Sequence, residues 1–306
     1  MDLMRVLVTG ATGLIGSAVC DALLARGDEV VGLTRDPERA TPKSPTVRWH
    51  AWQPVTERPP PEAFEEVDAI VNLVGEEINQ RLTERAKKRI RDSRITASRN
   101  LLQGVEAAGD RPTVFVGQSA VGYYGHRGEQ SVDEDAPAGP SAFDVDLVVD
   151  WEAAERQAEK LGMRVVILRT APILTKQGGL LRQLLVPFKL GLGGPIAGGD
   201  QYLPWIHLDD EVGMVLWALD FEHVTGAVNA AAPNAVTNRE FSKALGRALK
   251  RPALFPVPKL AVAAMRGREL AEIVSGGARV VPRRASDLGY RFSYEEIDGA
   301  IEAALR

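Results

Sequence analysis

One serine and two tyrosines that could take part in proton transfer lie within the stretch VFVGQSAVGYYG, residues 114–125. Tyr123 and Tyr124 follow Ser119 by four and five residues. A serine hydroxyl can polarise a substrate carbonyl, and a tyrosine can supply or remove a proton when a neighbouring cation lowers its pKa. Without such a cation the pKa stays near about 10, and the tyrosine is a poor base at neutral pH. A nucleophilic serine is disfavoured, because no histidine follows a recognisable triad pattern.

A glycine-rich turn near the N-terminus is the strongest motif in the chain. The stretch VLVTGATGLIGSAV places Gly10, Gly13 and Gly16 after an expected strand and at the start of an expected helix. Gly10 permits a tight turn, Gly13 lets backbone N–H groups approach a pyrophosphate, and Gly16 lets the helix pack against the sheet. The helix N-terminus favours an anion. The expected members of this dinucleotide site are Gly10, Thr12, Gly13, Leu14, Ile15 and Gly16.

The residue after the second expected strand bears on which dinucleotide binds. A carboxylate at that point would bind a ribose 2′-hydroxyl and repel a 2′-phosphate. The strand ends in GLTRDP, so Arg35 stands there, with Arg39 nearby. A guanidinium can bind a phosphate through two hydrogen bonds, which favours NADP(H). Because Asp36 is adjacent, NAD(H) stays open as the alternative, and so does a merely solvated arginine.

The elements that must position these residues alternate between strands and helices. Apolar runs bounded by turn residues predict strands, and a helical spacing of apolar residues follows several of them. This alternation predicts an α/β fold, a Rossmann-type doubly wound parallel sheet. The strands are expected at 4–10, 28–35, 46–52, 67–75, 112–119 and 163–170, and the helices at 14–26, 80–108 and 143–161.

The regular alternation of strands and helices ends after about residue 175, where a stretch rich in glycine and proline begins. We therefore expect an NADP(H)-binding domain at 1–175, to which 204–235 also contribute. The segments 176–203 and 236–306 are expected to form a smaller C-terminal α+β lobe on the substrate side.

Composition excludes several classes of protein. The net charge of −4 over 306 residues gives no electrostatic reason to expect a nucleic acid or an anionic membrane as partner. The sequence contains no run of about 20 apolar residues, so no membrane span is predicted. Cys20 is the only cysteine, which favours a reducing compartment, and no secretory signal is visible, so we expect a cytoplasmic protein. The four histidines lack the spacing of metal ligands, so no metal is expected.

Together these motifs resemble the extended short-chain dehydrogenase/reductases, the group that contains nucleotide-sugar epimerases and dehydratases. The resemblance covers nearly the whole chain. More narrowly, the chain resembles the atypical YfcH-like branch of this epimerase family, which ends in a small C-terminal domain of unknown function. The matching segments, in chain order, are SRITASRNLL, SAVGYYG, DWE, GGLLRQLLVPFKLGLGG, WIHLDD, VNAAAPNAVTNREF, RPALFPVP and RVVPRRASDLGYRF.

The resemblance implies roles for further residues. Ser119 is similar to the serine that polarises the substrate carbonyl and contacts the nicotinamide, and Tyr124 is similar to a tyrosine on the substrate side. The family's loop over the cofactor ribose corresponds here to the residues after Asn72, and its nicotinamide-side loop corresponds to LRTAPIL. The cofactor-binding residues that these two loops add are Leu73, Val74, Gly75, Ala171 and Pro172.

One part of the family pattern is missing. Ordinary members follow the serine with Tyr-x-x-x-Lys, in which the tyrosine is the general acid/base and the lysine helps to lower its pKa. Counting back from LRTAPIL puts these two positions at Asp144 and Val148. The segment AFDVDLVVDWE contains neither a tyrosine nor a lysine.

Two functions therefore stay open. The first is an NADP(H)-dependent oxidoreductase or epimerase with a small carbonyl-bearing or sugar-like substrate, in which Ser119 polarises the carbonyl and Tyr124 or a water supplies the proton. The second is a non-catalytic NADP(H)-binding redox sensor or an interaction protein associated with cell division. Because paired-helix dimers are common in this fold class, the pattern at 80–108 is a candidate homodimer surface.

Overall fold

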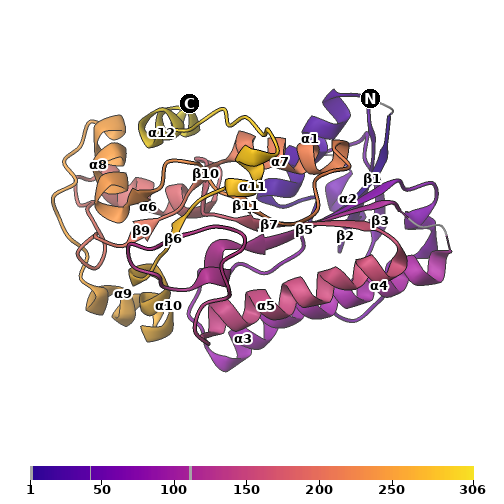
Figure 1. Ribbon diagram of the computed structural model, residues 1–306, viewed down its shortest axis with the longest axis horizontal. Helices are drawn as coiled ribbons and strands as arrows, with labels where there is room; N and C mark the ends of the chain where they lie inside the picture. The colour runs from indigo at the N-terminus through magenta and orange to yellow at the C-terminus, as the bar shows by residue number, and fades with distance from the viewer. Residues whose placement is uncertain (1–2, 42, 110–111) are drawn as a thin grey trace.

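A computed structural model describes residues 3–41, 43–109 and 112–306. Seven parallel strands form the main sheet, in the order β11-β7-β5-β4-β1-β2-β3. This order confirms the predicted Rossmann-type doubly wound sheet (Figure 1). The strands are β1 (Arg5–Thr9), β2 (Glu29–Thr34), β3 (Arg48–Ala51), β4 (Ala69–Asn72), β5 (Val114–Ala120), β7 (Arg164–Thr170) and β11 (Gly226–Ala230).

Burial of the strands follows from their apolar runs. In β1, Val6, Leu7 and Val8 are fully buried, because helices cover both faces of the sheet. Six of the seven strands correspond to the predicted runs. The seventh, β11 with the sequence GAVNA, was not expected as a strand, since glycine, alanine and asparagine have low strand propensity. Its pairing with β7 places it at the edge of the sheet.

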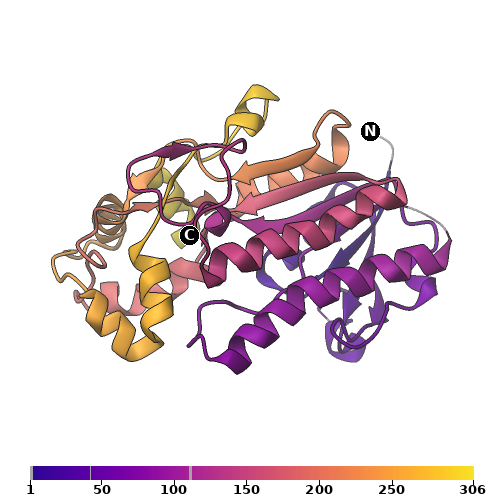
Figure 2. The ribbon, with the colours of Figure 1, turned by 60° about the horizontal axis from the view of Figure 1, so that its bottom comes forward.

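Two layers of helices enclose the sheet (Figures 1 and 2). On one face α1 packs against α7. On the other face α3, the π-helical turn η2 and α4 follow one another and lie beside α5, which continues into the 3-10 turn η4. Their bounds are α1 (Leu14–Ala25), α3 (Glu84–Arg91), η2 (Asp92–Thr96), α4 (Ala97–Ala108), α5 (Phe143–Glu155), η4 (Arg156–Leu161) and α7 (Leu208–Asp220).

A smaller lobe with its own apolar core follows the sheet. Leu181, Phe188, Trp205, Phe241 and Ile301 are among the side chains buried in that core. The helices of the C-terminal part are α6 (Gly179–Lys189), α8 (Asn238–Leu249), α9 (Lys259–Arg266), α10 (Arg268–Ser275), α11 (Arg283–Asp287) and α12 (Ile297–Leu305). Three two-stranded pairs complete the strands of the described residues: β8 (Ile173–Leu174) with β10 (Ile206–His207), β9 (Tyr202–Leu203) with β12 (Val236–Thr237), and β6 (Ser131–Val132) with β13 (Arg279–Val280).

Short helical turns occupy several loops. They are α2 (Pro37–Ala40), η1 (Pro61–Phe64) and η3 (Val121–Tyr124). Among the helices of the described residues, none is both long and apolar enough to cross a membrane.

Candidate functional site

Five neighbouring strands bring the predicted cofactor-binding residues to one edge of the sheet. Gly10 follows β1, Arg35 follows β2, Leu73 follows β4, Ser119 lies near the end of β5 and Ala171 follows β7. These strands are adjacent and parallel, so their carboxyl ends share one edge. Ligands of open α/β sheets bind at this edge.

The glycine-rich turn leaves no room for larger side chains. Gly10 has a φ of +62°, and a Cβ atom there would lie 2.7 Å from the carbonyl oxygen of Leu73. A Cβ atom at Gly16 would lie 2.2 Å from the carbonyl oxygen of Gly10, so α1 approaches the turn as closely as backbones can. Thr12 and Gly13 are exposed at the outer side of the turn.

The N-terminus of α1 fits a pyrophosphate. Gly13 is its N-cap residue and provides no side-chain cap, and the first turn has no acidic residue. The first helical hydrogen bond runs from the Ser17 N–H to the Gly13 carbonyl. The N–H groups of Leu14, Ile15 and Gly16 therefore precede the helical ladder and are free to bind an anion.

The loop after β4 is fastened to the end of β1. The Thr9 hydroxyl donates to the Asn72 side-chain oxygen at 2.7 Å and accepts from the N–H groups of Leu73 and Val74 at 3.0 and 3.2 Å. This fixes Leu73 and Val74 directly beside the Gly10 turn. Gly75 follows and is exposed at the sheet edge.

Arg35 stands at the end of β2 with its side chain exposed. Its guanidinium has no hydrogen-bond or ion-pair partner within the described part of the chain. The Asp36 carboxylate caps α2 by accepting from the Arg39 N–H at 3.1 Å. The acidic neighbour is therefore occupied locally, and among the described residues Arg35 is left unpaired.

Ser119 belongs to a buried ion-pair network. Its hydroxyl donates to Oε1 of Glu152 at 2.7 Å, and only 1% of Ser119 is exposed. Arg169 binds the same carboxylate through two bonds, Nε to Oε1 at 2.8 Å and Nη2 to Oε2 at 3.0 Å. Although burial opposes the charge of Arg169, Glu152 raises the pKa of this guanidinium. The Arg169 guanidinium therefore stays charged at neutral pH beside the serine.

Tyr124 is fully buried within the same network. Its hydroxyl donates to Oδ1 of Asn229 at 2.7 Å and accepts from Nη1 of Arg169 at 3.0 Å. Burial raises the pKa of Tyr124 to about 12. Tyr123 is partly exposed, and Arg169 lies over its ring at 3.5 Å from the centroid. The structure thus brings Ser119 and both tyrosines around one arginine, with the Tyr124 hydroxyl turned inward.

The first turns of α5 pack against the loop that contains the tyrosines. Val148, which the resemblance aligns with the family's lysine, is buried and lies 3.9 Å from a Cβ atom placed at Gly122. Glu152 follows one turn later on the same helix. Sequence reasoning missed Glu152 and Arg169, although a charged residue within the apolar strand RVVILRT is itself a signal of a buried partner.

Glu155 is a second buried acid on α5 that the sequence analysis did not identify. Its Oε1 accepts from the Asn72 side-chain amide at 2.6 Å, and its Oε2 would lie 2.1 Å from a Cβ atom at Gly117. Burial raises the pKa of Glu155 well above its ordinary range. Its side chain packs where only glycine leaves space on β5.

The loop after β7 is held by backbone hydrogen bonds. The Ala171 N–H donates to the Ala230 carbonyl at 2.9 Å, and the Pro172 carbonyl accepts from the Ile206 N–H at 3.2 Å. Below this loop, Glu211 of α7 accepts from the Thr170 hydroxyl at 2.8 Å. Burial raises the pKa of Glu211 to about 7.

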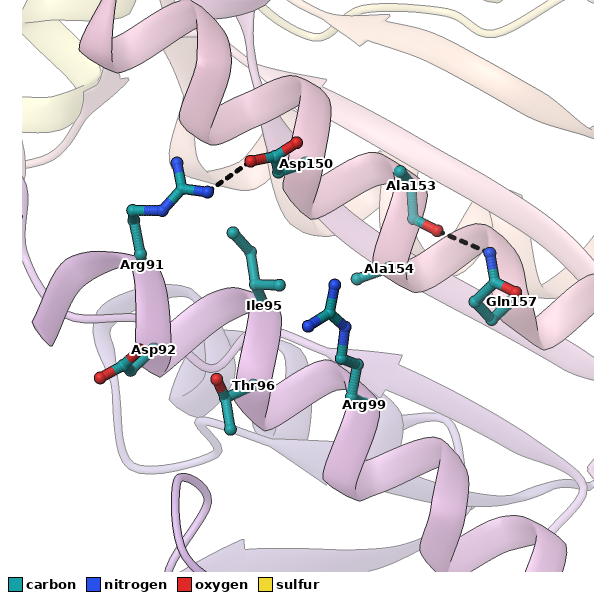
Figure 3. A pocket seen from close by; sticks show the side chains of 9 residues that line it. All are labelled: Arg91, Asp92, Ile95, Thr96, Arg99, Asp150, Ala153, Ala154 and Gln157. Carbon is teal, nitrogen blue, oxygen red and sulfur yellow. Dashed lines mark hydrogen bonds and ion pairs between the residues drawn. The ribbon is translucent and has the colours of Figure 1, made fainter. Parts of the chain in front are cut away.

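A separate groove of about 590 Å³ lies between the helices on the outer face (Figure 3). One wall comes from α3, η2 and α4 and the other from α5 and η4, and Arg91 bridges them by donating to Asp150. None of its lining residues belongs to the predicted cofactor or catalytic set. They are Arg91, Asp92, Ile95, Thr96, Arg99, Asp150, Ala153, Ala154 and Gln157.

Comparison with known proteins decides the family. Residues 6–231 match the family model described as "NAD dependent epimerase/dehydratase family". The chain belongs to this family. Residues 257–304 of this epimerase-family member match a second model, a domain of unknown function named DUF1731. The two matches confirm the resemblance to an atypical branch of the extended short-chain dehydrogenase/reductases with a small C-terminal domain.

Relatives of this epimerase-family member match along nearly its whole length. The bovine protein "Epimerase family protein SDR39U1" is 39% identical over 308 residues, covering 99% of this chain and 100% of the bovine one. "Epimerase family protein Mb2239" of Mycobacterium bovis is also 39% identical, covering 97% and 96% of the two chains.

Solved structures agree with this family assignment and with the fold. The human SDR39U1 protein (isoform 2), crystallised with NADPH, has a TM-score of 0.88 and 36% identity, covering 99% of this chain and 100% of that one. A UDP-glucuronic acid 4-epimerase from Bacillus cereus, solved with NAD, has a TM-score of 0.78 at 17% identity, covering 98% and 97%. The second likeness shows a shared fold alone.

Proposed function

We propose that this epimerase-family protein binds NADP(H) and acts as an oxidoreductase or epimerase on a small carbonyl-bearing or sugar-like molecule. The observation that supports this best is the uncapped N-terminus of α1, which Gly10, Gly13 and Gly16 bring next to the loop after β4. The NADPH in the structure of the human relative supports the same cofactor. The bound nicotinamide would supply or accept a hydride at the sheet edge beside Ser119.

The choice of NADP(H) over NAD(H) rests on Arg35. Its guanidinium is exposed and unpaired within the described part of the chain, at the strand end where a 2′-phosphate lies in folds of this type. The Asp36 carboxylate, which would repel that phosphate, is bound to the Arg39 N–H instead. We expect Arg35→Ser to weaken NADPH binding about tenfold and to leave NADH binding nearly unchanged, because one charge-assisted contact is lost.

The orientation of the Ser119 hydroxyl suggests its role. Because it donates to Glu152, its oxygen can accept a hydrogen bond from a substrate hydroxyl. During oxidation the substrate hydroxyl proton would pass to Ser119 as the serine proton passes to Glu152, and the hydride from the substrate carbon would be taken up by NADP⁺. During reduction the same protons move back, and Ser119 polarises the carbonyl. Since Ser119 is 1% exposed, its side chain must open toward the sheet edge when substrate binds.

We propose that Tyr124 acts by holding Arg169 in place, and that a water supplies any further proton. A hydroxyl that is buried, doubly hydrogen-bonded and shifted to a pKa of about 12 is poorly suited to exchange protons with a substrate. Tyr124→Phe should therefore lower turnover by about tenfold at most, with the loss of about 1 kcal/mol in stability that one buried hydrogen bond contributes. Loss of all turnover in a folded Tyr124→Phe variant would instead favour a direct acid/base role.

Turnover is tested by following NADPH oxidation with a panel of aldehydes, ketones and keto sugars. Ser119→Ala should slow any turnover that is found by about a hundredfold, the size typical of a lost proton-transfer group, and leave the dissociation constant of NADPH within about twofold. The matched control is Ser131→Ala, an exposed serine in β6 at the surface. Equal rates for Ser119→Ala and wild type would contradict the assignment of Ser119.

A second function is supported by the burial of both candidate hydroxyl groups. With Ser119 1% exposed and Tyr124 fully buried, the protein could bind NADP(H) without reacting, as a redox sensor or interaction protein would. Binding of NADPH with no consumption across the panel, together with different partner binding in the NADPH and NADP⁺ states, would favour this function over an enzyme.

A further inference from the structure

Arg94 is a half-buried arginine whose guanidinium forms no ion pair among the described residues. Within the described ranges, no carboxylate lies within 4.0 Å of it; the nearby Glu76 is paired with Arg89 at 2.9 Å. Nη1 of Arg94 donates to the backbone carbonyl of Glu76 at 2.8 Å, whereas Nε and Nη2 have no acceptor among the described residues. The other nearby acid, Glu155, accepts from the Asn72 side-chain amide at 2.6 Å instead. Two charged N–H groups of a half-buried guanidinium are therefore free to bind a ligand that offers hydrogen-bond acceptors.

The local backbone directs this side chain toward the site. Arg94 lies in the π-helical turn Asp92–Thr96, the only such turn among the described residues. Turns of this kind often occur at functional sites, since they rotate side chains away from the regular helical register. The guanidinium lies over the Trp151 ring at 5.0 Å from the centroid, and a Cβ atom at Gly75 would lie 3.1 Å from Cζ of Arg94.

These contacts place the charge on the nicotinamide side of the cofactor site. The pyrophosphate site is at the turn after β1, and the adenosine end extends toward Arg35 after β2. The other half of a dinucleotide must extend the opposite way, over β4 and β5. Gly75, against which Arg94 lies, follows β4 on this side and is exposed at the sheet edge.

The same contacts place Arg94 close to the position of the missing lysine. Trp151, on which its guanidinium lies, is three residues after Val148, so both face the same side of α5. Val148 faces Gly122 in the loop after β5, so a lysine there would extend toward the sheet edge, and Arg94 contacts α5 one turn away, at Trp151.

We propose that Arg94 binds the nicotinamide-side ribose of NADP(H) through its free Nε and Nη2 groups, and thereby replaces the lysine that the family has at position 148. This inference rests on the proposed binding of NADP(H). It assigns a cofactor contact to a residue outside the glycine-rich turn, outside Ser119 and outside the Arg35 site. Burial lowers the pKa of Arg94 only to about 10, so it is charged at neutral pH.

Two different nucleotides allow the two halves of the cofactor site to be tested separately. NADPH has the nicotinamide ribose, whereas 2′,5′-ADP has the adenosine and the 2′-phosphate but lacks that ribose. We expect Arg94→Gln to raise the dissociation constant of NADPH by about tenfold or more, as the loss of a charge-assisted hydrogen bond does, and to leave that of 2′,5′-ADP within about twofold. Isothermal titration of the full-length protein measures both, and Arg94→Lys should recover part of the NADPH affinity.

A second variant leaves Arg94 intact and so controls for damage to its packing on Trp151. Gly75→Ala places a methyl group against the guanidinium and should weaken NADPH binding with the same insensitivity of 2′,5′-ADP. The matched control is Gly128→Ala, at another exposed loop with open space around it, although its φ of +57° adds some backbone strain. The control should change neither affinity.

The outcomes separate the two proposals. Wild-type protein that binds neither nucleotide would overturn the proposed function and this inference with it. Wild-type protein that binds NADPH, with Arg94→Gln binding it equally well, would overturn this inference alone. Equal weakening of NADPH and 2′,5′-ADP by Arg94→Gln would also overturn it, since the effect would then reach the adenosine half through a general change in structure.

Discussion

At the scale of single residues, the site is built on charges and acids that the fold has removed from water. Glu152 and Arg169 form a bidentate ion pair in which the side chains are 6% and 4% exposed. Removing one member of such a pair leaves the other charged, buried and unpaired, which costs far more than the pair contributes as a whole. This pair lies beneath Ser119 and the two tyrosines, so substitutions in the pair test how far the site depends on it.

We expect Glu152→Gln to lower the free energy of unfolding by roughly 3–5 kcal/mol, the cost of leaving a buried Arg169 without its partner. Urea denaturation followed by circular dichroism measures this change. The double variant Glu152→Gln with Arg169→Met should lose much less than the sum of the two single changes, because no unpaired charge remains. Additive losses would contradict a coupled pair.

Glu211 provides a prediction about pH. Its pKa rises from an ordinary 4.5 to about 7 on folding, because burial disfavours the charged form. The folded state then binds more protons than the unfolded state between these two values, so the contribution of Glu211 to stability decreases as the pH rises through that window. Between about pH 4.5 and 7 the loss is of the order of 3 kcal/mol.

The comparison with Glu211→Gln isolates this effect from other titrating groups. The free energy of unfolding of the variant minus that of wild type should be larger at about pH 8 than at about pH 5, by a few kcal/mol. Urea unfolding at the two pH values gives the difference. A constant difference between variant and wild type would show that Glu211 titrates at the same pH in both states.

At the scale of elements, close backbone approach determines the cofactor turn. A Cβ atom at Gly16 would lie 2.2 Å from the carbonyl oxygen of Gly10, so α1 could not keep its place with a larger residue. A Cβ atom at Gly299 in α12 would meet nothing within 4 Å, so this helical glycine has no packing role. The two positions form a natural pair for substitution.

We expect Gly16→Ala to lower stability by about 1–3 kcal/mol through overpacking and to abolish most NADPH binding, because α1 must move away from the turn. Gly299→Ala should instead raise stability by up to about 1 kcal/mol, since alanine is the better helix former. Thermal unfolding and titration with NADPH measure the two effects. Retention of NADPH affinity in Gly16→Ala would contradict the role of this close approach.

At the scale of the whole molecule, the C-terminal segment is fastened to the sheet domain by hydrogen bonds from two buried side chains, Asp210 and Asn229. The Asp210 carboxylate accepts from the N–H groups of Ser293 and Tyr294 at 2.7 and 3.0 Å. Asn229, which holds the Tyr124 hydroxyl, also donates to the Val281 carbonyl at 3.0 Å. The DUF1731 region therefore contacts the network beneath Ser119 as well as the smaller lobe.

We expect Asp210→Ala to loosen the segment around Ser293 and Tyr294 and to cost about 1–3 kcal/mol, because two backbone N–H groups lose their acceptor. Hydrogen exchange should rise in residues 290–296 while β1 and β4 stay protected. Asp298→Ala is the matched control: that carboxylate pairs with Arg247 on the surface, with both side chains more than half exposed. Uniform exchange across the chain would point to global unfolding instead.

The groove between α4 and α5 is the surface at which we expect a homodimer. The helices that line this groove include much of the segment 80–108, which the sequence analysis named as a candidate homodimer surface. Arg99 is exposed in the groove without a partner among the described residues. If a second copy covers the groove, Ala153→Glu should shift the protein toward the monomer in size-exclusion chromatography with light scattering. A monomeric wild-type protein at every concentration tested would contradict this expectation.

Some of these features follow from the sequence alone, because they depend on local spacing. The glycine-rich turn, the alternation of apolar strands and helices, and Arg35 after the second strand are all readable along the chain, since each reflects neighbouring residues and a short-range backbone requirement. The missing Tyr-x-x-x-Lys is equally plain in AFDVDLVVDWE.

The rest was decided by tertiary structure, because it depends on residues far apart in the chain. Glu152 meets Ser119 only where α5 packs on β5, and Arg94 reaches Gly75 only through the π-helical turn and the loop after β4. A sequence records which residues have charge but not which charges the fold buries together. Packing alone determines that the Tyr124 hydroxyl points inward and that Arg94 is left with hydrogen-bond donors to offer a ligand.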